Sequence, residues 1–143
     1  MKKLGLMVVL VILAFCVSAI SCGQVGGSFT LTGIPSQYNG KYVFLEGEHR
    51  DGELLGCVSV NVETEEVKLP RISNGRVSIP MWVFNVSSNS VSKYSGSNTV
   101  EYLEIMICDS DDGDDAIAEI EFEDIVFKNG KATKSWNEGE VWD

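Results

Sequence analysis

Short apolar runs separated by turn residues are the feature that most limits what this 143-residue chain can fold into. In the clearest run, residues 53–62, Leu54 and Val60 fall on one face of an extended chain, and Leu55 and Cys57 fall on the other. Side chains of a β-strand alternate in this way, with a period of two. Downstream of residue 28 the chain shows no comparable helical period with capping residues. We therefore predict an all-β domain.

Turn chemistry supports the same fold class. Asn74-Gly75 and Asn129-Gly130 have the residue preference of type I′ hairpin turns. The two longest apolar strands are expected at 100–109 and 116–127, joined into a hairpin by the turn at 110–115, with a bulge at Asp124. We predict an antiparallel β-sandwich, Ig-like or similar, of seven to nine strands, with a small β-barrel as the alternative.

Proline limits one of the expected strands. Residues 77–86 continue as a strand beyond the Asn74-Gly75 turn, but Pro80 has no N–H to donate to a ladder. We expect this strand to lie at an edge or to contain a bulge.

The first 21 residues have the layout of a secretory signal peptide. Lys2 and Lys3 form a positive segment, an apolar run follows from Leu4 to Val17, and small residues close the segment. The run is short for a membrane span, which needs roughly 20 apolar residues. The pattern predicts export.

The end of this leader, Ala19-Ile20-Ser21-Cys22, resembles the lipobox of bacterial lipoproteins. The resemblance implies that the Cys22 thiol receives a diacylglycerol and that Cys22 becomes the first residue of a chain anchored by acyl groups such as palmitate. It also implies a place in the bacterial cell envelope, on the outer membrane or cell surface. Ordinary secretion, with cleavage at the same bond, is the open alternative. Cys16 fits less well because bulky Phe15 precedes it.

This division gives a signal peptide at 1–21, a flexible tether at 22–28 and a single all-β domain at 29–143. Removing Lys2 and Lys3 leaves 9 basic against 21 acidic residues, a net charge of −12. Such a balance excludes a nucleic-acid partner, whose phosphates require a basic face. It also disfavours contact between the domain surface and anionic lipid headgroups.

Cys57 and Cys108 remain as a pair once Cys22 is acylated. A disulfide between them would close a loop of about fifty residues, worth roughly 4 kcal/mol on the chain-entropy account. Two buried free thiols are the alternative, because an anaerobic envelope need not oxidise them.

A run of carboxylates around Gly113 is the sharpest candidate for a ligand site. Closely spaced carboxylates on a glycine-bearing loop can supply the oxygen ligands that Ca²⁺ prefers, so a weak Ca²⁺ site is one interpretation. A solvated hairpin tip is the other, since Asp and Gly also form turns. The residues are Asp109, Asp111, Asp112, Asp114 and Asp115.

The sequence gives little indication of catalytic activity. Glu119, Glu121 and Glu123 alternate on one strand face, and two facing carboxylates can hydrolyse a glycoside. A solvated sheet face explains the row better, and no nucleophile, phosphate-loop or zinc motif is present. We expect no enzyme activity and no cofactor. His49, between charged neighbours, reads as a solvated loop residue, and Trp142 is the tryptophan whose position favours exposure.

The sequence therefore predicts a non-catalytic, lipid-anchored envelope lipoprotein that binds a protein or a glycan. The polar stretch 87–98 is expected to be a mobile loop and a candidate contact surface. The alternative function is that of a lipocalin-like barrel holding a small apolar ligand, which would require a cavity in the interior.

Overall fold

A computed structural model describes residues 27–49, 52–57, 59–61, 66–85, 87–88 and 90–142. The signal peptide and Cys22 lie outside the described residues. Gly27 and Ser28, assigned above to the tether, belong to the folded domain: Ser28 begins the first strand, and the Gly27 N–H donates to the Tyr94 carbonyl at 2.8 Å.

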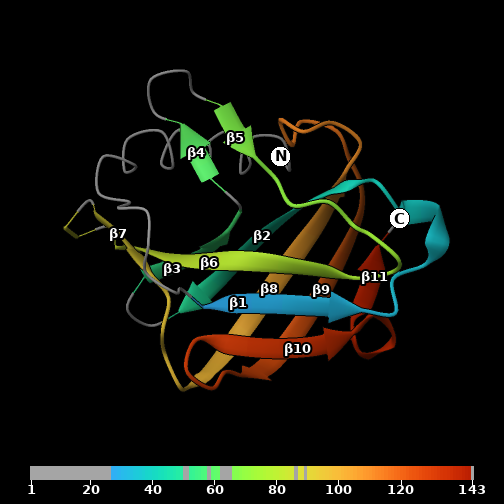
Figure 1. The fold of residues 1–143 in the computed structure, drawn as a ribbon. Coiled ribbons are helices and arrows are strands. Elements are labelled where there is room, and N and C mark those ends of the chain that lie inside the picture. Colours follow the sequence, from blue (N-terminus) through green and yellow to red (C-terminus); the bar gives the residue numbers. More distant parts are fainter. Residues whose placement is uncertain are drawn as a thin grey trace.

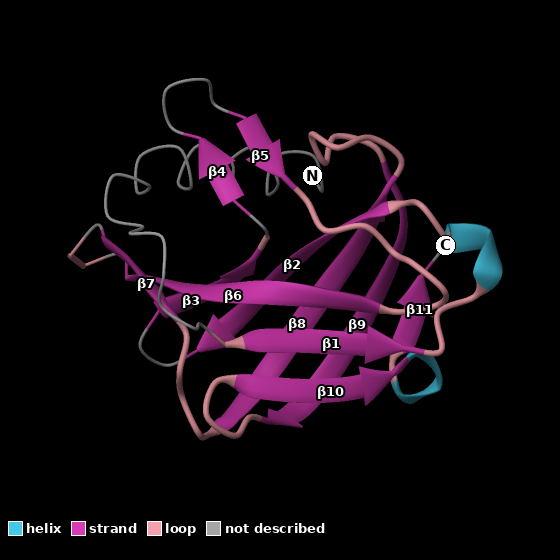
Figure 2. Ribbon diagram, in the orientation of Figure 1, coloured by secondary structure: helices cyan, strands magenta, loops and turns pink. Residues whose placement is uncertain are grey.

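Strands dominate the described residues, with two single turns of 3-10 helix, η2 (Ser36–Tyr38) and η3 (Trp136–Glu138), at the periphery (Figures 1 and 2). No helix within these residues is long and apolar enough to cross a membrane. The strands are β1 (Ser28–Thr32), β2 (Tyr42–His49), β3 (Gly52–Gly56), β4 (Ser59–Asn61), β5 (Glu66–Lys68), β6 (Val77–Asn85), β7 (Ser90–Lys93), β8 (Thr99–Cys108), β9 (Ala116–Val126), β10 (Lys131–Ser135) and β11 (Glu140–Trp142).

Nine of these strands form one curled sheet in the order β10-β1-β6-β3-β2-β8-β9-β11, with β7 also paired to β6. The pair β4-β5 forms a separate hairpin. The all-β prediction is confirmed, and the curl makes a half-barrel, a shape compatible with either a sandwich or a small barrel. The expectation of a purely antiparallel sheet is wrong in one place, because β1 and β10 run parallel.

The curl brings the two ends of the sheet face to face around one core. Figure 1 shows β10, β1 and β6 in front of β8 and β9, which cross behind them. The ring of Phe29 on β1 lies 5.7 Å from that of Phe122 on β9 and 6.4 Å from that of Phe127. All three rings are almost fully buried. Burial of apolar surface of this kind is the main force holding a small β domain together.

Strand β6 joins the two layers, and Pro80 stands where its neighbour changes. The segment Val77–Pro80 pairs with β1, whereas Met81–Phe84 pairs with β3. Among the described residues the Pro80-bearing part therefore has a ladder partner on one side only, in keeping with the expected edge position, while Met81–Phe84 lies inside the sheet. Because β3 ends at Gly56, the N–H that proline lacks would fall beyond the last residue of that ladder.

The two predicted Asn-Gly turns are confirmed. Asn74 and Gly75 have φ of 52° and 69°, and Asn129 and Gly130 have 51° and 74°, as type I′ turns require. The hairpin of β8 and β9 is also confirmed.

Two details of strand register differ from expectation. The stretch 53–62 is not one strand, because β3 ends at Gly56 and Ser59–Asn61 pairs with β5. At the predicted bulge, Asp124 has φ of 49°, and the buried side chains slip from Phe122 to Ile125. The break in the ladder itself lies elsewhere, between Ile107 and Cys108.

Candidate ligand-binding cleft

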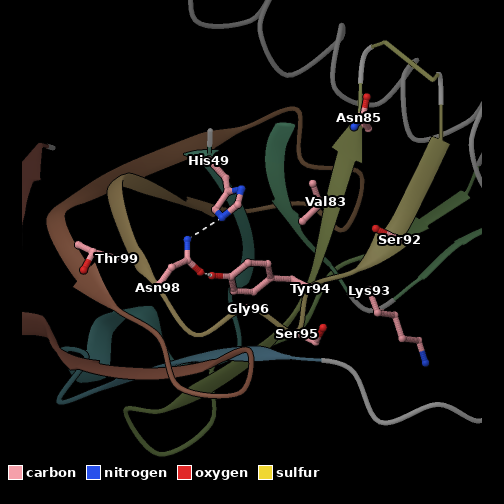
Figure 3. Close-up of a pocket in the computed structure, with 10 residues that line it drawn as sticks. All are labelled: His49, Val83, Asn85, Ser92, Lys93, Tyr94, Ser95, Gly96, Asn98 and Thr99. Carbon is pink, nitrogen blue, oxygen red and sulfur yellow. Dashed lines mark hydrogen bonds between the residues drawn. The ribbon is translucent and has the colours of Figure 1, made fainter. Parts of the chain in front are cut away.

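A cleft of about 700 Å³ opens beside β7, at one end of the curled sheet. We call it the β7 cleft; Figure 3 labels its ten lining residues, which are His49, Val83, Asn85, Ser92, Lys93, Tyr94, Ser95, Gly96, Asn98 and Thr99. A smaller recess of about 350 Å³ adjoins it and shares His49, Asn98 and Thr99. The size falls within the range of about 300–1,000 Å³ that is usual for small-molecule sites.

A chain of hydrogen bonds crosses the cleft from Tyr94 through Asn98 to His49 (Figure 3). The Tyr94 hydroxyl donates to Asn98 Oδ1 at 2.5 Å, and Asn98 Nδ2 lies 2.6 Å from His49 Nε2. An amide nitrogen can only donate, so this arrangement makes His49 Nε2 the acceptor and fits the tautomer that carries its proton on Nδ1. Both polar ends of the Asn98 side chain are thereby held in place.

The floor of the cleft is Tyr94, which is 3% exposed. Its ring packs edge-on against Phe127 at 5.1 Å and against His49 at 5.7 Å. Burial raises the pKa of Tyr94, so its hydroxyl remains a donor at neutral pH. Gly96 permits this packing, because a Cβ there would come within 2.6 Å of Asn98 Oδ1 and 2.9 Å of the Tyr94 hydroxyl.

Charge differs between the two recesses. Among the described residues that line the β7 cleft there is one cationic side chain, Lys93, and no carboxylate. The adjoining recess contains Glu48, Glu53 and Glu101. The cleft therefore has an acidic neighbour on one side, and its own walls are mostly uncharged.

Sequence reasoning found part of this site. The stretch 87–98 was expected to be a loop that contacts a ligand, and residues 92–96 and 98 do line the cleft. It is not one loop, however, because Ser90–Lys93 forms β7. His49 was expected on a solvated loop, yet it ends β2 and is half-buried in the cleft wall. Nothing in the sequence signals the pairing of His49 with Asn98, which lie 49 residues apart.

Several carboxylates of the acidic turn between β8 and β9 are engaged by groups of the protein itself. Asp109 pairs with Lys41, and Asp112 Oδ1 accepts bonds from the Ser110 hydroxyl and from the Asp114 N–H at 3.2 Å. These bonds hold the pKa of Asp112 below its ordinary value. Within the described residues no three His, Cys, Asp or Glu side chains are placed to hold a metal. The weak Ca²⁺ site suggested for Asp109, Asp111, Asp112, Asp114 and Asp115 stays a prediction, beside the solvated hairpin tip.

Cys57 and Cys108 are free, so the possible disulfide between them is corrected to two buried thiols. Burial raises the pKa of Cys57 to about 12. Burial, together with the carboxylates of the acidic turn, raises that of Cys108 to about 11. Both thiols stay protonated at neutral pH and are poor nucleophiles.

The glutamate row noticed on β9 extends across the outer face of the sheet. In the cross-strand register Glu46 on β2 faces Glu104 on β8, which faces Glu121 on β9, which in turn faces Glu140 on β11. Desolvation, followed by the charges of Glu104 and Glu53, raises the pKa of Glu46 to about 7. Sequence reasoning missed Glu46 because its strand reads as apolar on both faces.

The tryptophans do not gather at the cleft. Trp82 is 8% exposed and Trp136 packs on Tyr38 with ring centroids 5.5 Å apart, while Trp142 is 50% exposed, as expected.

Comparison of the chain with models of protein families, with curated proteins and with solved structures finds no match.

Proposed function

We propose that this chain is an exported bacterial envelope lipoprotein, held on a membrane by lipid on Cys22, and that its β domain is a non-catalytic module binding a protein or a glycan in the β7 cleft. The leader and the lipobox-like residues 19–22 support export and anchoring. Acyl chains contribute about 0.8 kcal/mol per buried methylene, so two or three chains hold a soluble domain on a bilayer.

The observation that carries the binding role is the β7 cleft itself. A concave site with a few convergent, pre-positioned polar groups is the usual form of a ligand site. Here the amide of Asn98 is fixed on both sides, by Tyr94 and by His49, before any ligand arrives. Groups that are already ordered lose little entropy on binding.

The same geometry favours binding over chemistry. Glycoside hydrolysis needs two carboxyl groups flanking the bond, and none is found among the described residues that line the β7 cleft. Glu46, whose pKa is raised, lies outside both recesses, on the outer face of the sheet.

The lipocalin-like alternative is less well supported. That function needs an apolar interior cavity, but the rings of Phe29, Phe122 and Phe127 occupy the space between the two layers. We therefore place the ligand at the β7 cleft instead of inside the sheet.

Two measurements test the proposal. Mass spectrometry of the mature chain purified from membranes should show a lipid adduct on Cys22. Cys22→Ala should abolish the adduct and release the protein from the membrane, whereas Cys16→Ala should change neither the adduct nor the attachment.

For the binding role, chemical shifts of the labelled mature chain should move at the β7 cleft when an envelope extract is added. An unmodified N-terminus would remove the anchor, and shifts confined to another face would remove the cleft.

A further inference from the structure

The side chains that line the β7 cleft are suited to one class of ligand. Its walls carry two amides, Asn85 and Asn98, and three hydroxyls, on Ser92, Ser95 and Thr99. An amide and a hydroxyl each both donate and accept hydrogen bonds. Sugar hydroxyls do the same, so a glycan can form paired donor and acceptor contacts along such a wall.

Protein ligands generally need a different kind of site. Binding energy between proteins concentrates in large apolar or aromatic anchors that enter desolvated pockets. The apolar members of this lining are Val83, which is half-buried, and Tyr94, which is 3% exposed and forms the floor. A shallow polar cleft with a buried aromatic floor gives a protein anchor little surface to bury.

The charged side chains around the cleft narrow the class of ligand further. The described part of the cleft lining has Lys93 but no carboxylate, and the adjoining recess places Glu48, Glu53 and Glu101 at its border. An acidic glycan would meet this border and a mature chain with 9 basic and 21 acidic residues. A neutral glycan meets neither penalty.

We propose that the β7 cleft binds a short segment of a neutral glycan, with the Asn98 amide as its central contact. The inference rests on the proposed function, since it names the ligand class of the same site. Tyr94 and His49 act as positioning residues: each uses one hydrogen bond to orient Asn98. The second N–H and the second lone pair of that amide then point to fixed places where a pair of sugar oxygens can bind.

The test uses the full mature chain in detergent micelles and a panel of neutral trisaccharides of N-acetylglucosamine, glucose, mannose and galactose. Each is titrated to about 20 mM, so that binding with a Kd of about 1 mM, or about −4.1 kcal/mol, is still detected. The chain contains one histidine, so the His49 ring gives unique NMR signals. At least one sugar should shift the His49 and Asn98 side-chain signals saturably. Asn98→Ala should weaken binding at least tenfold, and Tyr94→Phe should weaken it less.

Asn137→Ala is the matched control, because it removes an exposed amide far from the cleft and should leave the affinity unchanged. If Asn98→Ala fails to fold, Ser92→Ala with Asn85→Ala tests the same wall. The inference is overturned if no sugar in the panel shifts the cleft signals, or if acidic trisaccharides bind more tightly than neutral ones.

A peptide is the competing occupant, and its outcome is distinguishable. In the described sheet β7 pairs on one side, with β6, so a peptide could add a strand along Ser90–Lys93. Shifts along the β7 backbone with a peptide and none with sugars would refute the glycan class while leaving the proposed binding role standing. No response to either would refute both.

Discussion

Glu46 offers the sharpest test of the electrostatics of this fold. Its side chain is largely desolvated on the outer face of β2, and Glu104 on β8 and Glu53 on β3 add negative charge around it. Its Oε1 atom is buried and has no hydrogen-bond partner among the described residues. Each of these surroundings disfavours the ionised form, which is why the pKa rises from 4.5 to about 7.

The raised pKa makes a definite prediction about stability. Between pH 4.5 and 7 the folded protein binds more protons at Glu46 than the unfolded chain, so stability from this group falls as the pH rises through that window. A pKa difference of about 2.5 corresponds to about 3.4 kcal/mol at 1.36 kcal/mol for each pKa. Because Glu46 is partly open to solvent, screening reduces this to about 1–2 kcal/mol.

The perturbation is Glu46→Gln, which keeps the shape and removes the charge. Denaturant unfolding from pH 4 to 8 should show no gain over the parent below pH 4.5 and a gain of about 1–2 kcal/mol above pH 7. Glu123→Gln, on an exposed carboxylate of the same face, is the control and should change stability by less than about 0.5 kcal/mol at every pH. A gain that is independent of pH, or one that shrinks as the pH rises, would refute the reasoning.

Three further outcomes follow from the geometry. Nitrogen-detected NMR at pH 8 should find the His49 ring of the parent protonated on Nδ1, and an Nε2-protonated ring would contradict the hydrogen-bond chain. Gly96→Ala forces a Cβ against Asn98 Oδ1, so this variant should show a fraction of the Nε2-protonated tautomer. A thiol reagent should leave Cys57 and Cys108 unmodified in the native protein and modify both after unfolding; rapid native reaction would contradict their burial. Gly56→Ala should cost about 1–3 kcal/mol in denaturant unfolding, because its Cβ would lie 2.6 Å from Ile79 Cγ2. An unchanged midpoint would show that the side chains of the neighbouring strands make room for the methyl group.

Local chemistry was the predictable part of this fold. The Asn-Gly turns and the β8–β9 hairpin depend on neighbours in sequence, so residue preferences alone identify them. The parallel pairing of β1 with β10 joins residues about a hundred positions apart, and it follows from the curl of the whole sheet. The break after Gly56 is also a tertiary effect, because the alternation of the apolar residues continues through it.

In the β7 cleft, too, the local part could be predicted from the sequence and the long-range part could not. The polar stretch 87–98 identified one wall of the cleft, since polar loop residues often bind ligands. The opposite wall comes from His49 at the end of β2, and no local pattern reveals its contact with Asn98, 49 residues further along the chain. The sequence also shows how many carboxylates the acidic turn has, but not which groups they bind. In the structure Asp112 accepts a hydrogen bond within its own turn and Asp109 pairs with Lys41.

The start of the folded domain bears on where the β7 cleft lies relative to a membrane. Gly27 donates to the Tyr94 carbonyl at the floor of the cleft, five residues after the proposed acylated Cys22. Five residues of extended chain span at most about 18 Å. The proposed anchor therefore keeps this end of β1 near the bilayer, while the turn at Arg76 lies beyond the opposite end of β1.

Energy transfer from a dye on the protein to labelled lipid headgroups can measure this asymmetry. Buried Cys57 and Cys108 do not compete for the dye, so Ser95→Cys and Arg76→Cys can be labelled selectively. Transfer should be stronger from position 95 than from position 76. Ten Gly/Ser residues inserted after Val25 should weaken it at position 95, because such a linker adds a root-mean-square length of about 16–19 Å. Equal transfer from both positions, or no effect of the insertion, would mean that the anchor does not hold the cleft near the membrane. A ligand held there would then have to come from the medium and not from the surface to which the protein is attached.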